Sequence, residues 1–197
     1  MTEALPALVL FALVMSGTPG PNVLMIAAAA AGHGVRATWP HNLGIAFGFG
    51  AMLFVVGLGI GAPLHANATA HAVMRWLGAA WQLWLAWKIA TAPPPDTAGA
   101  RPPLGFWGAA GFQWVNPKAW MICAAASATH VRPDAPLLPQ VALISVVFVL
   151  ACIPCNWAWA AFGAAMGRLL REPARLRMFN ITMALLLVLS LWPMLRG

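Results

Sequence analysis

The sequence predicts an all-α integral membrane protein with six transmembrane helices, arranged as two inverted repeats of three helices. Three observations lead to this fold class. The chain has 197 residues, of which 61% are hydrophobic and 8% are charged, whereas a soluble domain is roughly 45–50% apolar and about 25% charged. The apolar residues form six stretches, each close to the length of about 20 residues that an isolated span needs. Two of these stretches are interrupted by helix-breaking residues.

The six predicted spans leave little sequence for a soluble domain. They cover residues 5–31, 43–63, 73–90, 106–128, 139–163 and 179–195. None shows sustained alternation of apolar and polar residues, so we expect helices and not barrel strands. The chain is therefore predicted to be a single transmembrane domain. Its first repeat covers about 1–91, a linker about 92–104 and the second repeat about 105–197.

The first span contains the stretch SGTPGPN, from Ser16 to Asn22. Proline removes a backbone donor and clashes with the preceding turn, and glycine weakens a helix, so this stretch should break the span. The residues before the span, MTEAL, include Glu3 and no Lys or Arg. A secretory signal has a basic start, so we expect this segment to remain as the first span.

The second span is rich in glycine and has a histidine, His41, at its mouth. A lone histidine at a span end is most often an interfacial residue. The glycines are Gly44, Gly48, Gly50, Gly57, Gly59 and Gly61. The first two are four residues apart, a spacing that lets helices approach closely. Packing inside the monomer is the interpretation we favour, and a homodimer is the alternative.

The fourth span, FWGAAGFQWVNPKAWMICAAASA, is interrupted by NPK at Asn116 to Lys118. The two interruptions lie about half a chain length apart and at similar depths in their spans. Halves of three spans insert in opposite senses, so matching interruptions should meet near the bilayer midplane. Half-helix ends there leave backbone groups free to bind a ligand. A pair of ordinary proline kinks is the alternative interpretation.

Lys118 within the fourth span needs a partner. A cation near the bilayer centre costs at least about 2.5–3.5 kcal/mol on insertion scales. All four carboxylates of the chain lie in a tail or a loop: Glu3, Asp96, Asp134 and Glu172. Lys118 must therefore bind backbone carbonyls, water or an anionic ligand, unless its span lies off-centre and the side chain snorkels. The functional interpretation is a site for a carboxylate, helped by the positive ends of half-helices.

The distribution of basic residues predicts the orientation. One set of links carries Arg36, Lys88, Arg101, Arg168, Arg171, Arg175 and Arg177. The opposite side carries Arg75, Arg132 and Arg196. Because basic loops stay cytoplasmic, both termini should face outward. The formal charge of +7 is explained by this topology, and no aromatic and basic surface indicates binding to nucleic acid.

Four segments carry a resemblance to a known family: TPGPN with the following GHGVRA, LGAAWQLWLAWKIA, and NPKAW. They resemble the LysE/RhtB family of amino-acid exporters, over nearly the whole chain. The segments WLAWKIATAP, GFWGAAGFQWVNPK and NITMALLLVL resemble the cysteine and O-acetylserine branch. The resemblance implies a secondary active exporter of the inner membrane, driven by protons and without a cofactor. Its substrates would be small polar or thiol amino acids, or those of the homoserine and threonine type.

The motif residues that the resemblance carries over to the candidate site are Pro19, Gly20, Pro21, Asn22, Asn116, Pro117 and Lys118. We add Thr18 and Gln113 to the expected substrate-binding residues, because their side chains can hydrogen-bond the polar groups of a substrate. Second-rank candidates are Ser16, Asn42 and Asn156. The family pattern includes an acidic residue in the fifth span, where this chain offers only Ser145, Cys152 and Asn156. Proton coupling through a carboxylate is thereby in doubt, and Lys118 and His41 are the titratable substitutes.

Two other classes of transporter compete with amino-acid export. Cys152 and Cys155 form C-x-x-C, the spacing of redox centres, which suggests a transmembrane thiol-disulfide carrier. Such a carrier would need reactive cysteines in both halves, and the fourth span offers only Cys123. A divalent metal exporter would need clustered carboxylates or imidazoles, which the spans lack, so no metal site is expected. No motif groups a nucleophile with a base and an orienting residue, so the chain is not expected to be an enzyme.

Overall fold

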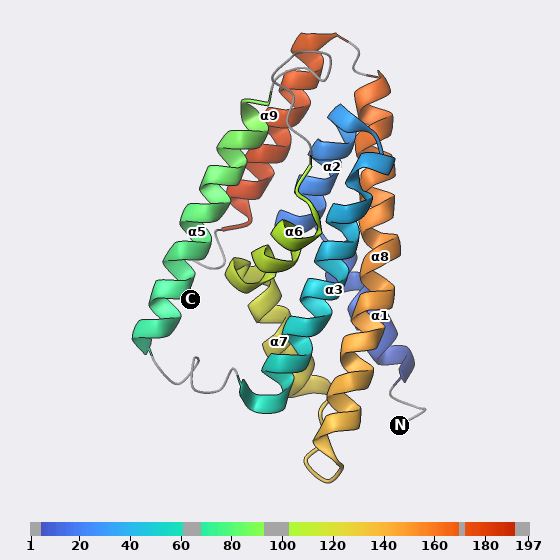
Figure 1. The fold of residues 1–197 in the computed structure, drawn as a ribbon, viewed down its shortest axis with the longest axis vertical. Helices are drawn as coiled ribbons and strands as arrows, with labels where there is room; N and C mark the ends of the chain where they lie inside the picture. The colour runs from blue at the N-terminus through green and yellow to red at the C-terminus, as the bar shows by residue number, and fades with distance from the viewer. Residues whose placement is uncertain (1–4, 61–67, 93–102, 170–171, 192–197) are drawn as a thin grey trace.

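The computed structural model describes residues 5–60, 68–92, 103–169 and 172–191 (Figure 1). These residues form eight α-helices and no strand, so the predicted all-α class is confirmed for them. Several expectations fall outside the described residues: those on Gly61, on most of the linker and on the two chain ends.

The described residues of the first half of the chain form four α-helices. The first predicted span consists of two of them, α1 (Leu5–Gly17) and α2 (Pro21–His33), with a bend of 54° between them. A 3-10 turn leads into α3 (Trp39–Val55), which ends in a π-helical turn at Val56–Ile60. The third predicted span falls on α5 (Ala68–Ala90). The chain is therefore broken where SGTPGPN predicts a break.

The second half repeats this order of elements. The fourth predicted span falls on α6 (Phe106–Phe112), a 3-10 turn at Gln113–Val115 and α7 (Pro117–His130). The second half continues with α8 (Leu137–Leu169) and α9 (Pro173–Leu189). The predicted break at NPK is also present, since α7 begins at its proline.

Only part of the predicted membrane crossing can be tested by length and apolarity. Among the described residues, the helical stretch Arg36–Gly59 and helix α8 are each long and apolar enough to cross a membrane. The bent pair of α1 and α2 qualifies as a third crossing if it is counted as one span. The finer arrangement of six spans therefore stays a proposal.

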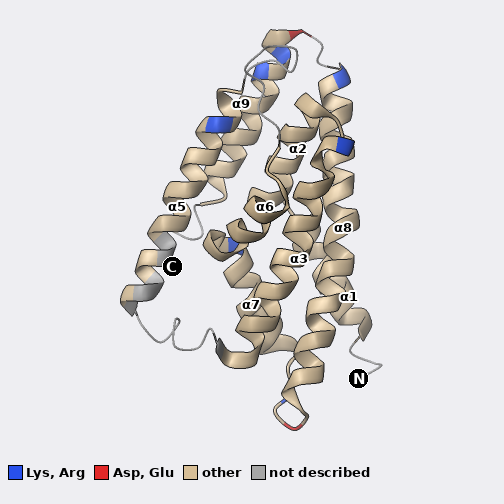
Figure 2. Ribbon diagram, viewed as in Figure 1, with Lys and Arg blue, Asp and Glu red and all other residues tan. Residues whose placement is uncertain are grey.

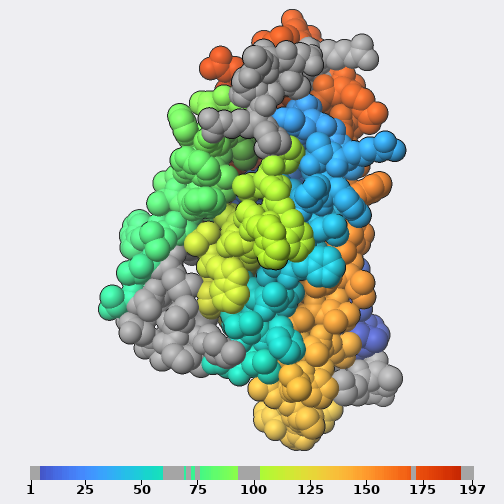
Figure 3. Space-filling model, viewed as in Figure 1, coloured from blue at the N-terminus to red at the C-terminus, as the bar shows by residue number. Residues whose placement is uncertain are grey.

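Helix α8 is a common packing partner of several other helices in the bundle. Its 33 residues extend about 50 Å, and α1, α2 and α3 all pack against it. Helix α3 also packs against α6, while α5 and α9 pair with each other at one flank (Figure 1). In the space-filling view, α6 and α7 come to the surface between α5 and α3 (Figure 3). The two segments of the fourth predicted span are therefore flanked by helices on several sides and open to the surface on this face.

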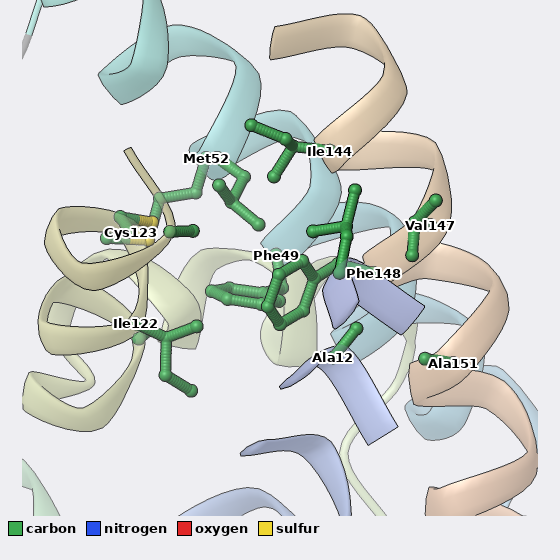
Figure 4. Close-up of a cluster of buried hydrophobic side chains, with 13 residues drawn as sticks. Ala12, Phe49, Met52, Ile122, Cys123, Ile144, Val147, Phe148 and Ala151 are labelled. Atoms are coloured by element: carbon green, nitrogen blue, oxygen red, sulfur yellow. The ribbon is translucent and has the colours of Figure 1, made fainter. Parts of the chain in front are cut away.

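A buried apolar cluster joins α1, α3, α7 and α8 (Figure 4). Phe49 of α3 and Phe148 of α8 form its centre, with ring centroids 5.5 Å apart in an edge-to-face arrangement, a favourable geometry for aromatic pairs. Ala12 of α1 and Ile122 of α7 lie beside the two rings. This cluster fixes the lower half of the first span next to the lower half of the fourth.

The glycines of α3 allow close helix packing within the chain. A Cβ at Gly44 would overlap the carbonyl of Phe106, and a Cβ at Gly48 would overlap the backbone of Ala110. Both neighbours belong to α6. The favoured interpretation of these two glycines, packing inside the monomer, is therefore confirmed. A homodimer remains untested.

The two ends of the bundle differ in charge (Figure 2). One end, where α5 and α8 finish and α9 starts, carries Arg36, Lys88, Arg168, Arg175 and Arg177. At the opposite end, in the loop between α7 and α8, Arg132 contacts the carboxylate of Asp134 at 2.6 Å. The described part of the chain thus keeps the charge asymmetry that the loops predict.

Candidate functional site

At the first break, three carbonyl oxygens near the end of α1 accept hydrogen bonds from outside the regular helix. The Thr18 backbone N–H donates to Val14 O, and the Thr18 hydroxyl donates to Met15 O. The indole Nε1 of Trp159, on α8, donates to Gly17 O over 3.0 Å. Helix α2 then begins at Pro21, where the missing N–H of proline has no cost. At this break one helix ends with hydrogen bonds to several of its last carbonyls, and a second helix begins at a proline.

The second break has a different local design. Asn116 adopts an extended conformation, as a residue before proline is biased to do. Its side-chain oxygen accepts a hydrogen bond from the Lys118 backbone N–H at 3.1 Å. Asn116 is thus an N-cap with Pro117 as the first residue of α7. Local sequence alone accounts for the start of this half-helix.

Lys118 reaches across to the first break. Its Nζ donates to Thr18 O at 2.7 Å, to Thr18 Oγ1 at 2.8 Å and to Pro19 O at 3.5 Å. The ammonium therefore lies at the carbonyl end of α1, where a helix dipole favours a positive charge. Of the partners expected for Lys118, the structure provides backbone carbonyls. These come from a segment 100 residues earlier in the chain.

A second polar contact joins the same two breaks. Asn22 Nδ2 donates to Gln113 Oε1 at 2.9 Å, and Gln113 Nε2 donates back to Asn22 Oδ1 at 3.2 Å. Gln113 also donates to Ala109 O and is fully buried. Asn22 and Lys118 both follow the first proline of a half-helix, and both reach the other break. The interruptions at Ser16–Asn22 and Asn116–Lys118 are thus in direct contact.

A small cavity lies where these breaks meet. It offers about 30 Å³ to the centres of water molecules, which is room for about two or three waters. Its apolar wall includes Phe49 from the middle of α3, and its other wall includes Cys152 from the middle of α8. The cavity is therefore at mid-height in the bundle. Its described lining residues are Met15, Ser16, Thr18, Gly20, Pro21, Asn22, Val23, Phe49, Asn116, Lys118, Ala119, Ile122, Cys152 and Asn156.

The cavity includes most of the expected site residues but not all of them. Of the first-rank set, Pro19, Gln113 and Pro117 are outside the lining, although Pro19 and Gln113 contact residues that line it. Of the second-rank set, Ser16 and Asn156 line the cavity. Asn42 does not, and it instead accepts a hydrogen bond from Asn156 Nδ2 at 3.2 Å. What each of these residues binds stays a prediction.

Sequence reasoning missed the wall of the site. Cys152, which the sequence singles out only by its C-x-x-C spacing and its place in the fifth span, lines the cavity, and its Sγ accepts a hydrogen bond from Asn156. Met15, Phe49 and Ile122 are ordinary apolar residues of their helices, and only tertiary packing brings them here. No local signal in the sequence distinguishes them from core residues.

His41 corrects an expectation. It was expected at an interfacial span mouth, but it is only 2% exposed, and neither ring nitrogen has a hydrogen-bond partner among the described residues. It lies on the same helix as Gly44 and Gly48, whose close packing against α6 explains why this end of α3 is enclosed. His41 does not line the cavity.

The residues of the two competing classes are placed as follows. All three cysteines are free thiols, and Cys155 contacts Leu13 O of α1 at 3.7 Å. Within the described residues, no group of three or more His, Cys, Asp or Glu side chains is close enough to hold a metal ion. Among the described residues that line the cavity, none is acidic, and Lys118 is the basic residue.

Comparison with known proteins agrees with the geometry. Residues 13–190 match the family of LysE type translocators. The chain belongs to this family. This LysE-family chain is 36% identical over 179 residues to the cysteine/O-acetylserine efflux protein of Salmonella typhimurium strain LT2, with 90% of each chain covered. It is 34% identical, with the same coverage, to the protein of that name in Escherichia coli strain K12.

No solved structure shows a significant match. Membership in a translocator family, together with the apolar helices, makes this LysE-family chain a multi-pass protein of the inner membrane.

Proposed function

We propose that this protein is a secondary active exporter of small polar or thiol amino acids, such as cysteine or O-acetylserine, from the cytoplasm to the outside. Two kinds of support stand behind the proposal. The chain belongs to a family of translocators, and its relatives are described as efflux proteins for these two compounds. The mid-height cavity between two broken helices supplies a place for such a substrate.

The observation that carries the proposal is the ammonium of Lys118 in that cavity. Its nitrogen is held by neutral oxygens alone, and no carboxylate among the described residues lines the cavity. An unneutralised positive charge in a low-dielectric interior attracts an anionic group strongly. The α-carboxylate of an amino acid is such a group, and Asn22, Asn116 and Asn156 offer hydrogen bonds around it.

The size of the cavity implies that the site changes shape during transport. Space for a few water molecules is less than an amino acid needs. We propose that two inverted repeats, about 1–91 and 105–197, rock about the site, with Gly17 and Gly20 as hinges. The matching order of broken and unbroken helices in the two halves supports this arrangement. Its basic end would face the cytoplasm, with both termini outside.

The decisive test is transport by purified protein in proteoliposomes. We expect Lys118→Met to reduce counterflow of labelled cysteine and O-acetylserine at least tenfold, because the carboxylate loses its positive partner. Lys88→Met is the matched control, since Lys88 lies in the last turn of α5, outside the cavity. Wild-type counterflow by a correctly inserted Lys118→Met variant would refute the proposed site.

Proton coupling is a separate part of the proposal. The expected driving force is the proton gradient, and Lys118 and His41 are the candidate titratable groups. An imposed pH gradient that is acidic on the side opposite the cytoplasmic face of the protein should drive uphill export in the same vesicles. Absence of any effect of the gradient, with counterflow intact, would exclude protons as the coupling ion.

A further inference from the structure

The contacts of Lys118 describe a cradle for an ammonium group. Thr18 O and Thr18 Oγ1 both accept from Nζ at short distance, and Pro19 O accepts at 3.5 Å. A Cβ at Gly20 would lie 2.7 Å from Cδ and 3.1 Å from Nζ of Lys118. Glycine at this position therefore lets the lysine side chain lie directly on the backbone of the break.

The cradle belongs to the break itself and not to Lys118. Its oxygens are at the carbonyl end of α1, where the helix dipole provides partial negative charge. Thr18 and Gly20 both line the cavity, so the same oxygens are within reach of a solute there. The Thr18 hydroxyl is oriented by its own hydrogen bond to Met15 O at 3.1 Å, which leaves its lone pairs for an ammonium.

A free amino acid carries both charges that this site can exchange. Its ammonium is chemically equivalent to the ammonium of Lys118, and its carboxylate is the partner that Lys118 lacks. When such a zwitterion enters, Lys118 can leave the cradle for the carboxylate while the substrate ammonium takes the vacated oxygens. The ammonium of Lys118 and the oxygens of Thr18 then each have an oppositely charged or polar partner in both arrangements.

We propose that the carbonyl and hydroxyl oxygens of Thr18, with the carbonyl of Pro19, are the subsite for the α-ammonium of the substrate, and that Lys118 vacates them to bind the α-carboxylate. The inference rests on the proposed function and adds to it a substrate class: solutes that carry both groups on one carbon and no further positive charge. The same exchange removes the Lys118–Thr18 contact, which is one of the polar contacts between the two halves of the chain.

This substrate class distinguishes an amino acid from an amine or an acid that carries only one of its two charged groups. An amine without a carboxylate cannot draw Lys118 from the cradle, so its ammonium finds the subsite occupied. An acid without an ammonium can pair with Lys118 but brings no positive charge to the oxygens of Thr18. A second cation on the side chain would be repelled by Lys118, with no carboxylate in the described lining to compensate.

The test uses two sets of matched compounds as competitors of labelled cysteine or labelled serine counterflow in proteoliposomes. The first set is cysteine, cysteamine and 3-mercaptopropionate, and the second is serine, ethanolamine and 3-hydroxypropionate. We expect each amino acid to compete at least tenfold better than its amine or its acid. An amine or acid that competes within threefold of its parent overturns the subsite. If neither amino acid is transported above protein-free vesicles, the proposed function fails, and the inference fails with it.

A variant separates the subsite from a merely structural role of Lys118. In Lys118→Met the cradle is empty, so binding of cysteine should weaken while binding of cysteamine stays the same or strengthens. The ratio of their affinities, measured by ligand-induced shifts of the unfolding temperature in detergent, should fall at least tenfold. Lys118→Gln is the second variant if the first does not fold. Lys88→Met should keep the wild-type ratio, and an equal loss for both ligands in either Lys118 variant contradicts the proposal.

Discussion

At the scale of single residues, the two breaks show which part of the site the sequence determines locally. Pro21, Asn116 and Pro117 start their half-helices by rules that apply to any sequence, so the positions of the breaks could be predicted. Backbone carbonyls as partners of Lys118 were among the expected possibilities too. Its actual partner, the carbonyl of Thr18, could not be predicted, because the contact joins segments 100 residues apart.

The burial of His41 and the place of Cys152 in the cavity wall were missed for the same reason. Both depend on which helix packs against which, and the residues themselves carry no local signal for it.

The amide pair of Asn22 and Gln113 should contribute measurably to stability. Asn22→Leu leaves the fully buried amide of Gln113 without its partner, and we expect a loss of about 1–3 kcal/mol in the free energy of unfolding. Replacing both residues by leucine should cost less than the sum of the two single changes. Chemical unfolding in detergent measures the double-mutant cycle. Additive single effects would show that the pair does not interact.

The exposed loop between α7 and α8 offers a prediction about pH. The guanidinium of Arg132 donates to Asp134 and holds the pKa of that carboxyl below its ordinary value, which is about 3.9. The ion pair therefore stabilises the folded protein at pH values above the unfolded pKa of Asp134. This stabilisation is lost as the pH falls through the lower pKa that Asp134 has in the folded protein. In Arg132→Ala, the titration midpoint of Asp134 should rise toward the ordinary value.

Carbon-13 labelling of aspartate reports this midpoint, because the chain has only one other aspartate, Asp96. Arg36→Ala is the control and should leave the Asp134 midpoint unchanged. A midpoint that does not move in Arg132→Ala would show that the ion pair is absent in solution.

The cysteines give a prediction that separates amino-acid export from redox transport. Cys155 contacts α1 and Cys152 contacts Asn156, both as free thiols. Changing both to serine should leave amino-acid counterflow within a few-fold of wild type, because serine keeps the size and the hydrogen-bonding ability. A complete loss of transport with normal insertion and stability would favour the thiol-disulfide alternative.

At the scale of helices, the sequence located the segments but not their neighbours. The described helices fall on the six predicted apolar stretches, because apolar length and helix breakers are local properties. The pairing of α5 with α9 and of α8 with α2 was not predictable from hydropathy, since lipid-facing and helix-facing apolar residues look alike in a sequence. The glycines of α8 illustrate this difficulty.

Gly163 and Gly167 of α8 lie directly against the backbone of α2, where a Cβ would overlap the carbonyls of Ala27 and Ala31. Gly163→Ala should therefore lower the free energy of unfolding by about 1–3 kcal/mol through overpacking. Gly111→Ala is the matched control, because nothing lies within 4 Å of a Cβ at Gly111 of α6. Thermal unfolding in detergent compares the two, and equal stability would show that α2 and α8 pack less closely than described.

At the scale of the whole molecule, the charge asymmetry of the bundle predicts its orientation in the membrane. The end with Arg36, Arg168 and Arg175 should face the cytoplasm, and the loop with Arg132 should face out. The asymmetry could be predicted from the loops, because it depends on the order of spans and not on their packing. Its effect on insertion requires an experiment in cells.

Single cysteines introduced into a variant without native cysteine test this orientation. Asp134→Cys should react with a membrane-impermeant maleimide in intact cells, whereas Arg175→Cys should react only after the cells are opened. Both positions are exposed, so a lack of reaction does not come from burial. The reverse labelling pattern would place the basic end outside.

The contact between Lys118 and the first break has a consequence for biosynthesis. A ribosome makes Thr18 and Pro19 long before it makes Lys118, so the oxygens that receive the ammonium are already in the bilayer when the lysine arrives. The first half of the chain thus provides the hydrogen-bond acceptors that Lys118 needs when the second half inserts. If a cell expressed the second half by itself, Lys118 would enter the membrane without these acceptors, and we expect much of the product to be degraded.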